Sequence, residues 1–293
     1  MDAMADFLRQ TAKSNGIPLT HAALVLPSTE VFTRELVMPA MTEQQLLYNL
    51  PYEFRDYLTE EKNKYFFDYS MREVLRDESG QPTEMNLLAC ATLKSTVESY
   101  RTMLRRAGFR LRVLTPSECA YSAVLQAYYR RTQQEGRDLC VVNLGHSATF
   151  LYIYRGGHFA SRREIEVGMS DLEHLVADQC SVDVHVAHEY VRQNYNHVLE
   201  SEQARELYGR IAVEVVKAVN FFNYNNRERE LTQLCLCGGG SAIQPLYDTI
   251  ADTTGMTLHT SAELLGQQMT TEEPWMYLRA IGGVDLGIKG GLR

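Results

Sequence analysis

Apolar and polar positions along this chain follow two periods, which predict an alternation of strands and helices. Alternation at every second residue, or a short apolar run bounded by turn residues, predicts strands at 21–26, 30–37, 109–114, 138–144, 148–155, 158–166 and 231–237. Spacing of three and four residues predicts helices at 93–107, 117–131, 168–180, 183–194, 201–228 and 242–253. Strands and helices mixed in this order are typical of an α/β fold.

Residues 30–92 form a unit of their own in this pattern. After the first strand, Thr42 followed by Gln45 predicts a helix start with a capping box, and Pro51 predicts a kink or a second helix start there. Two further strands, joined by a polar hairpin loop, are expected at 65–74 and 84–92. We therefore expect a small strand–helix–strand–strand subdomain inserted into a larger fold.

Both ends of the chain are expected to be helical. A C-terminal helix is predicted at 274–281, and Gly282 and Gly283 are expected to end it because glycine is a poor helix former. An N-terminal helix is predicted at 3–15, with an inward face made by Phe7, Leu8 and Ala12.

The composition is that of an ordinary globular protein long enough for two lobes. Of 293 residues, 45% are hydrophobic and 23% charged, and the net charge of −8 disfavours a dedicated nucleic-acid binder. No apolar stretch approaches the roughly 20 residues of a membrane span, and the first residues lack the apolar core of a signal peptide. We expect a cytoplasmic protein that reaches a membrane only through a partner.

The cysteines and histidines give little support to a metal site. The six cysteines lie apart and mostly within apolar runs, so buried reduced thiols are expected. Cys235 and Cys237 share one face of a predicted strand, but no second pair has the spacing of a zinc site. His185, His188 and Glu189 have helical spacing without the order of a metalloprotease helix, so we expect them at the surface.

Two glycine turns carry the candidate chemistry. In residues 140–153 two apolar strands meet at a short polar turn, whose backbone N–H groups can be aimed at a phosphate. In residues 234–242 a strand of buried type runs into three glycines and then a helix. Such glycines let the backbone pass close to a flat ligand, and the helix start favours anions. Together the two turns predict a nucleotide cleft.

Six phrases spread over the chain carry a resemblance to a known family. They are residues 31–43 (VFTRELVMPAMTE), 105–114 (RRAGFRLRVL), 142–149 (VNLGHSAT), 163–168 (REIEVG), 236–242 (LCGGGSA) and 280–285 (AIGGVD). In this order they resemble the PilM family of type IV pilus assembly proteins, within the actin-like group that includes FtsA and the large heat-shock chaperones. The first phrase is the most specific to PilM, whereas the two glycine turns are shared by the whole group.

The resemblance implies an architecture: a two-lobed, ribonuclease-H-like duplicated actin fold with nucleotide in its cleft. The first lobe would span 1–136, with 30–92 as its inserted subdomain, and the second lobe would span 137–273. Residues 274–293 would form a C-terminal helix that returns to the first lobe. In the sequence, the polar and turn-rich residues 130–137 mark the boundary between the lobes.

The resemblance also implies a partner. PilM-like proteins bind a short cytosolic N-terminal segment of the inner-membrane protein PilN, which places them at the inner face of the cell membrane. The residues expected to border the groove for that segment are Met38, Pro39, Ala40 and Met41, since Met-rich surfaces adapt to peptides. The alternative is a loop whose apolar residues pack inward, and self-association stays open.

Two departures from the family pattern concern the nucleotide. The family opens with a strand, an Asp-Ile-Gly turn and a hairpin that form the first phosphate loop, and this chain starts at the helix that follows. At the second phosphate turn the family has Asp where this chain has Asn143, which lacks the charge that would hold Mg²⁺ through water. Both departures predict that ATP with Mg²⁺ binds weakly or not at all, and without the metal hydrolysis is not expected.

The turns and the resemblance together give the nucleotide-binding candidates: Asn143, Gly145, His146, Ser147, Thr149, Gly168, Glu214, Lys217, Gly238, Gly239 and Gly240. Each has a structural alternative. The first turn could be an ordinary hairpin, and Gly168 could serve close helix packing. Glu214 and Lys217 could belong to a solvated helix face, and the three glycines 238–240 could supply a positive φ at a strand-to-helix turn. The aromatic residues near the end of the same long helix, which we expect in the core, are Phe221, Phe222 and Tyr224.

Three functions compete. The favoured one is a scaffold that recruits an extended membrane-protein segment and has no catalytic residue. An active ATPase or a sugar-kinase relative would need an Asp that acts as base and the first phosphate loop, and we find neither. An FtsA-like division protein would add a C-terminal amphipathic helix, which residues 287–293 are not expected to form.

Overall fold

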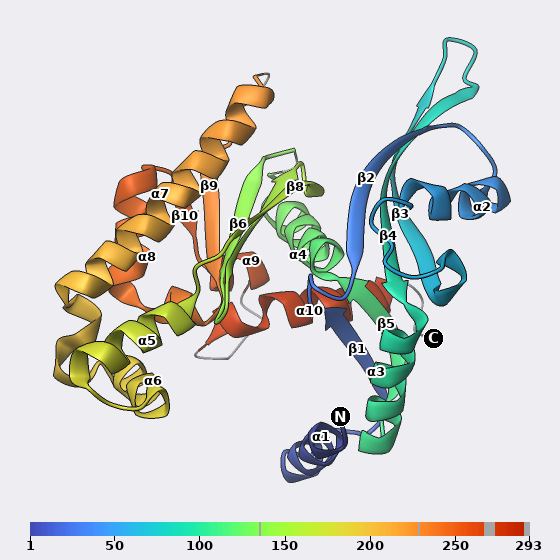
Figure 1. The fold of residues 1–293 in the computed structure, drawn as a ribbon. Helices are drawn as coiled ribbons and strands as arrows, with labels where there is room; N and C mark the ends of the chain where they lie inside the picture. The colour runs from blue at the N-terminus through green and yellow to red at the C-terminus, as the bar shows by residue number, and fades with distance from the viewer. Residues whose placement is uncertain (135, 228, 267–272, 290–293) are drawn as a thin grey trace. The chain divides into compact units, whose positions relative to one another are not determined.

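The computed structural model describes residues 1–134, 136–227, 229–266 and 273–289 (Figure 1). These residues form two compact units: unit 1 holds Met1–Ala123 and the C-terminal part from Arg279, and unit 2 holds Val124–Leu278. The division falls inside the helices α4 (Ser117–Thr132) and α10 (Pro274–Lys289). The sequence placed it in the polar segment 130–137, because a boundary inside a continuous helix leaves no break in composition.

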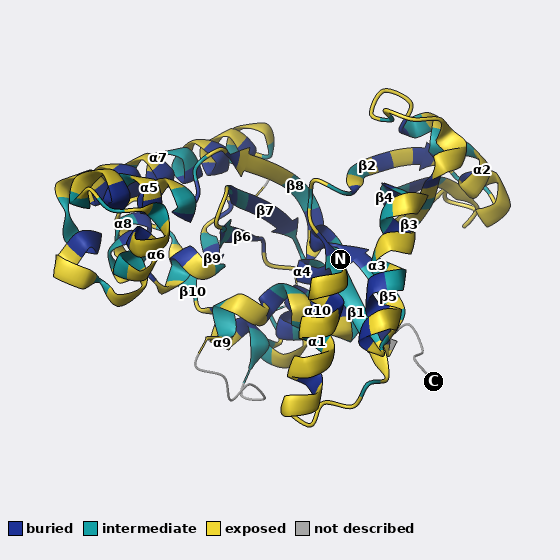
Figure 2. Cartoon of the chain, turned by 60° about the horizontal axis from the view of Figure 1, so that its bottom comes forward, coloured by how far each residue is buried: buried dark blue, intermediate teal, exposed yellow. Residues whose placement is uncertain are grey.

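Unit 1 contains a two-stranded parallel sheet, in which β1 (His21–Leu26) pairs with β5 (Arg110–Pro116). The helices α1 (Asp2–Ser14) and α3 (Lys94–Ala107) pack together against one face of this sheet. Leu8 and Ala12 lie on the inward face of α1, as predicted, but Phe7 is 62% exposed. Figure 2 shows that much of the surface of α1 is exposed. The buried stripe runs through Ala5 and Ala12, and Phe7 falls beside it.

The inserted subdomain of unit 1 has the predicted strand–helix–strand–strand order. β2 (Phe32–Pro39), β3 (Tyr65–Arg76) and β4 (Pro82–Leu93) form an antiparallel sheet in the order β2-β4-β3, and α2 (Glu43–Glu53) covers one face. The capping box is present, since Thr42 and Gln45 bond each other's side chains and backbone. Pro51 lies inside α2, and the short 3-10 helix η1 (Lys62–Lys64) precedes β3.

Two half-buried thiols of unit 1, Cys90 and Cys119, predict how stability depends on pH. Burial raises the pKa of Cys90 and of Cys119 to about 12, and the neighbouring Cys119 adds to the shift at Cys90. The folded state therefore keeps these protons at pH values where the unfolded chain loses them. The stabilisation is complete below the ordinary thiol pKa and is lost as pH rises toward 12, by up to about 1.4 kcal/mol per pH unit for each thiol.

Urea unfolding between about pH 8 and about pH 11 measures this dependence. In a Cys90→Ala, Cys119→Ala double variant, the free energy of unfolding should fall less steeply with rising pH than in the unaltered chain. Cys180→Ala, at a half-buried cysteine in the other unit, is the matched control and should keep the full slope. An identical slope in all three proteins would contradict the assignment.

Unit 2 is built on a five-stranded sheet in the order β10-β9-β6-β7-β8 (Figure 1). Its strands are β6 (Leu139–Leu144), β7 (Thr149–Arg155), β8 (His158–Ile165), β9 (Gln233–Cys237) and β10 (Thr257–His259). β6, β7 and β8 pair antiparallel as consecutive hairpins. β9 pairs in parallel with β6, and β10 pairs in parallel with β9. The β7–β8 turn uses Gly156 and Gly157, both with positive φ.

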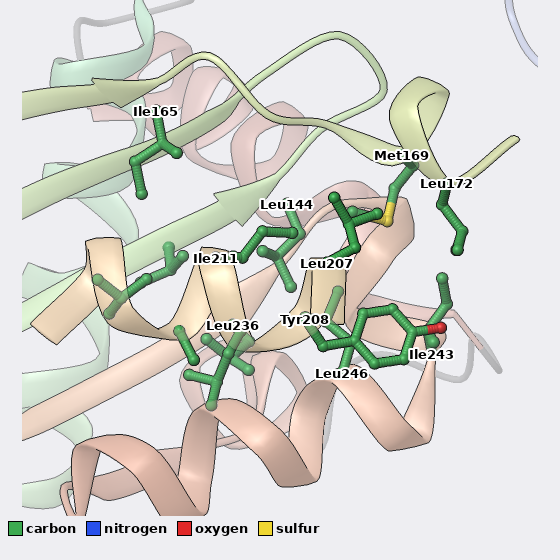
Figure 3. Packing of buried hydrophobic residues seen from close by; sticks show 14 of the residues in the cluster. Leu144, Ile165, Met169, Leu172, Leu207, Tyr208, Ile211, Leu236, Ile243 and Leu246 are labelled. Carbon is green, nitrogen blue, oxygen red and sulfur yellow. The ribbon is translucent and has the colours of Figure 1, made fainter. Parts of the chain in front are cut away.

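The main core of unit 2 lies between one face of this sheet and a layer of helices. The layer consists of α5 (Met169–Cys180), α6 (Val184–Gln193), η2 (Tyr195–Glu200), α7 (Glu202–Asn225) and α8 (Gln244–Thr254). Figure 3 shows Leu207 and Tyr208 of α7 beside Leu144 and Met169, where β6 ends and α5 begins. A short helix, α9 (Ser261–Leu265), was not predicted; Thr260 caps its start.

Two predictions about helices fail for reasons of packing. α10 continues through Gly282 and Gly283. A Cβ at Gly282 would overlap Ala120 O, and one at Gly283 would lie 2.9 Å from Val25 Cγ2. The glycines allow close approach and do not end the helix. Of the three aromatic residues expected in the core near the end of α7, Phe222 is buried, whereas Phe221 and Tyr224 are each 69% exposed. Residues 290–293 of the C-terminal segment lie outside the described residues.

Candidate functional site

The first glycine turn joins β6 to β7 and is tightly closed. The Gly145 N–H donates to Asn143 O at 3.0 Å and to Ala148 O at 3.1 Å, and a Cβ at Gly145 would lie 2.7 Å from Ala148 O. The turn therefore needs glycine for its own geometry. Within the described part of the chain, the N–H groups of His146 and Ser147 have no hydrogen-bond partner. These two donors are what the turn can offer to an anion.

The start of α5 packs directly on this turn. Met169 N–H donates to Gly145 O at 3.0 Å, and Ser170 N–H donates to His146 O at 2.8 Å. Gly168 N–H donates to the Asp171 carboxylate at 2.8 Å, and a Cβ at Gly168 would lie 2.6 Å from Ala148 N. Protein acceptors thus already use the first donors of the helix, and Gly168 is required by close packing.

The second glycine turn lies against the first. β6 and β9 run parallel, with Asn143 opposite Cys237, so their carboxyl ends meet at one edge of the sheet. Gly238 has φ +82°, and a Cβ there would overlap the Asn143 amide oxygen and lie 2.6 Å from Leu144 O. The structure therefore brings the two turns together in unit 2, at the carboxyl ends of parallel strands, which is the edge where ligands bind in open α/β sheets.

The three glycines of the second turn do not serve the same purpose. Gly238 needs its positive φ, and a Cβ at Gly240 would lie 2.8 Å from Leu144 Cβ and 2.7 Å from Met169 Sδ. Gly239 has an ordinary φ, and a Cβ there would meet nothing within 4 Å. Two of the glycines are thus explained by conformation and packing, and Gly239 alone faces open space.

We expect alanine at these positions to have different consequences. Gly240→Ala should lower the free energy of unfolding by about 1–3 kcal/mol, since the side chain must displace buried neighbours. Gly239→Ala should change it by less than about 0.5 kcal/mol, as at other open surface positions. Urea unfolding followed by circular dichroism measures both, and equal losses for the two variants would contradict this division of roles.

Asn143 carries the polar side chain that lies between the turns. Its amide oxygen accepts a weak bond from Cys237 Sγ at 4.0 Å. An amide contributes no charge, so this position supplies nothing to neutralise Mg²⁺. Among the described residues, no group of three or more histidine, cysteine or carboxylate side chains is arranged to hold a metal ion.

A buried carboxylate behind the first turn was not found from the sequence. Glu173 on α5 lies 2.8 Å from His188 Nδ1 on α6 and 3.7 Å from His146 Nδ1 in the turn. A negative charge at this depth disfavours a phosphate at the turn. The spacing of Gly168 and Asp171 in the sequence could have indicated the cap of α5. No neighbouring residues in the sequence indicate the contacts of Glu173, because its two histidine partners lie on other elements.

Three of the nucleotide-binding candidates do not lie at the open space beside the two glycine turns. Thr149 is fully buried in β7, and its hydroxyl donates to Val167 O at 2.9 Å, so it fixes the strand end. Glu214 and Lys217 pair with each other at 2.7 Å on the exposed face of α7. The Lys217 bond lowers the pKa of Glu214, and no contact in the described residues joins the pair to either turn.

The expected partner-binding residues lie at the end of β2 and in the loop before α2. Met38 is buried in the core of the inserted subdomain, and Ala40 and Met41 pack partly against that core. This is the inward-packing alternative, which follows from strand alternation continuing to Pro39. On the opposite face of β2, Pro39 is exposed and Val37 is 66% exposed.

Cys235 and Cys237 are both buried, and burial raises the pKa of Cys235 well above its ordinary value. Neither of these two cysteines forms a disulfide, as predicted. In the described part of the chain, no helix is both long enough and apolar enough to cross a membrane.

Comparison with known proteins identifies the family. A family model described as type IV pilus assembly protein PilM matches residues 1–273. Among solved structures, the chain is similar to one described as a PilM-PilN type IV pilus biogenesis complex, with 18% identity and a TM-score of 0.78 over 99% of this chain and 85% of that chain. Comparison with curated protein sequences gives no match.

Two further structures show weaker likeness. Ethanolamine utilization protein EutJ from Carboxydothermus hydrogenoformans is 15% identical, with a TM-score of 0.48 over 67% of this chain and 62% of that chain. The archaeal actin homolog Ta0583 is 14% identical, with a TM-score of 0.47 over 75% of this chain and 91% of that chain. These two scores are too low to carry an argument. The match to the family model over residues 1–273 shows that the chain belongs to the PilM family of type IV pilus assembly proteins, and the first structure shares its fold.

Proposed function

We propose that this chain is a scaffold of type IV pilus assembly that holds the cytosolic N-terminal segment of a PilN-like inner-membrane protein. The observation that carries the proposal is the family match over residues 1–273, supported by the fold shared with a PilM-PilN complex. Such binding would keep the protein at the inner face of the membrane through its partner.

The inserted subdomain offers an edge for an extended segment. β2 pairs with β4 on one side and with no other strand among the described residues. Extended peptides commonly bind by adding to such an edge, where main-chain bonds give affinity and alternate side chains give specificity. Val37 and Pro39 are the exposed side chains beside this edge, and they replace Met38 as the residues we expect to touch the segment.

A pull-down with immobilised N-terminal peptides of the PilN-like protein tests this proposal, with a scrambled peptide as control. Val37→Asp should lower peptide affinity at least about tenfold, because it places a charge on an apolar contact. Val186→Asp, at an exposed valine of α6 in unit 2, is the matched control and should bind normally. No retention by any such peptide would count decisively against the scaffold.

Nucleotide binding in this proposal is weak and does not drive turnover. The open space at Gly239 and the N–H groups of His146 and Ser147 suit a phosphate group. The uncharged Asn143 and the buried Glu173 oppose Mg-ATP. These residues would bind and orient a nucleotide, and none of the described ones in the two turns is placed to activate a water molecule.

A further inference from the structure

A basic pocket of unit 1 lies outside both proposed binding regions. α3 ends at Gly108 in a left-handed cap with φ +100°, and β5 begins two residues later at Arg110. Arg110 N–H donates to Thr20 O at 2.8 Å, which fixes the start of β5 beside the start of β1 (Figure 1). The pocket formed there has a volume of about 620 Å³ and is lined by His21, Arg101, Arg105 and Arg110 together with apolar side chains.

The charge of this pocket is opposite to that of the chain. Three arginines and one histidine line it, and no carboxylate does, although the protein carries 37 acidic and 29 basic residues. Arg101 has a partner, Glu98, at 2.9 Å. Within the described ranges, Arg105 and Arg110 have no ion pair. Positive charges gathered without counter-charges repel one another, and a bound anion would relieve that repulsion.

Helix capping explains only part of this cluster. Basic residues in the last turn of a helix interact favourably with its carbonyl end, and this accounts for Arg105 and Arg106. It does not account for Arg110, which lies at the start of a strand, or for Arg101, a turn earlier in α3. Arg106 faces α1, where it pairs with Asp2, and is not among the residues that line the pocket.

We propose that this pocket binds a phosphate ester. Guanidinium groups bind phosphate oxygens through paired, charge-assisted hydrogen bonds, and a phosphate can accept such bonds from more than one of the arginines that line this pocket. Leu19, Phe109 and Leu111 add apolar lining, which suits the carbon part of an ester. Two sources share this chemistry: the headgroup of an anionic phospholipid and a free phosphate compound. The site is independent of the scaffold proposal.

Two binding measurements on the full chain distinguish these sources. Calorimetry with sodium pyrophosphate and with glycerol 3-phosphate tests the free compounds. Sedimentation with phosphatidylcholine vesicles, with and without phosphatidylglycerol, tests the headgroup. Binding in either arm supports the proposal and names the source, and it should weaken as salt is raised. Absence of binding in both arms overturns it.

The matched variants decide whether this pocket is responsible. Arg105→Gln and Arg110→Gln should each lower affinity roughly tenfold, since each removes a charge-assisted bond. Arg55→Gln, at an arginine whose side chain is 83% exposed elsewhere in unit 1, should bind like the unaltered chain. Circular dichroism and thermal unfolding verify that all three fold. Equal binding by all variants, or equally tight binding of a polyglutamate peptide, would reject the assignment.

Discussion

Alanine in place of Gly282 should lower the free energy of unfolding by about 2 kcal/mol, although alanine is the better helix former. The Cβ would overlap Ala120 O, which is backbone and cannot move aside as a flexible side chain can. To make room, α10 must shift away from α4, and the apolar contacts around Gly283 would loosen with it. Urea unfolding followed by circular dichroism measures the loss.

Gly209→Ala is the matched control for this substitution. Gly209 also lies inside a helix, α7, but a Cβ there would meet nothing within 4 Å. The same change should therefore raise the free energy of unfolding, by up to about 1 kcal/mol. If Gly282→Ala also stabilised the protein, the close approach of α10 to α4 would be wrong.

Aspartate in place of Asn143 should raise the affinity for Mg-ATP at least about tenfold, because it restores a carboxylate that can hold Mg²⁺ through water. The side chain lies between the two glycine turns, since a Cβ at Gly238 would overlap its amide oxygen. The gain should appear in calorimetry with Mg-ATP and disappear when the metal is chelated, since the new charge acts on the cation.

Asn220→Asp controls for this gain, since it adds the same charge at an exposed position of α7. It should leave the affinity unchanged. Tight Mg-ATP binding by the unaltered chain would overturn the view that the site is degenerate. A gain of equal size at Asn220 would show that net charge, and not the position of the carboxylate, is responsible.

Local signals predicted most of the secondary structure. Thr42 with Gln45 marks the start of α2, Gly108 marks the end of α3, and Gly156 with Gly157 forms the β7–β8 turn. Each of these signals acts within a few residues, through a cap or a positive φ, so the sequence pattern is sufficient. The family resemblance then supplied the actin-like fold, which periodicity alone does not specify.

Features that depend on distant contacts could not be predicted in this way. Gly282 looks like a helix breaker until Ala120 is seen against it. Phe221 and Tyr224 look like core residues, and the strand alternation that buries Met38 extends further than its sequence suggested. In the candidate site, the sequence found both glycine turns but could not show that the donors of α5 are already bonded or that Glu173 lies behind the first turn.

The most direct test of the scaffold is calorimetry with the N-terminal segment of the PilN-like protein, titrated into the chain with and without Mg-ATP. We predict binding of the segment with the same affinity in both conditions, because in this proposal the inserted subdomain recognises the segment and the nucleotide site is weak. Binding that requires Mg-ATP, or steady ATP hydrolysis with no binding of the segment, would contradict it.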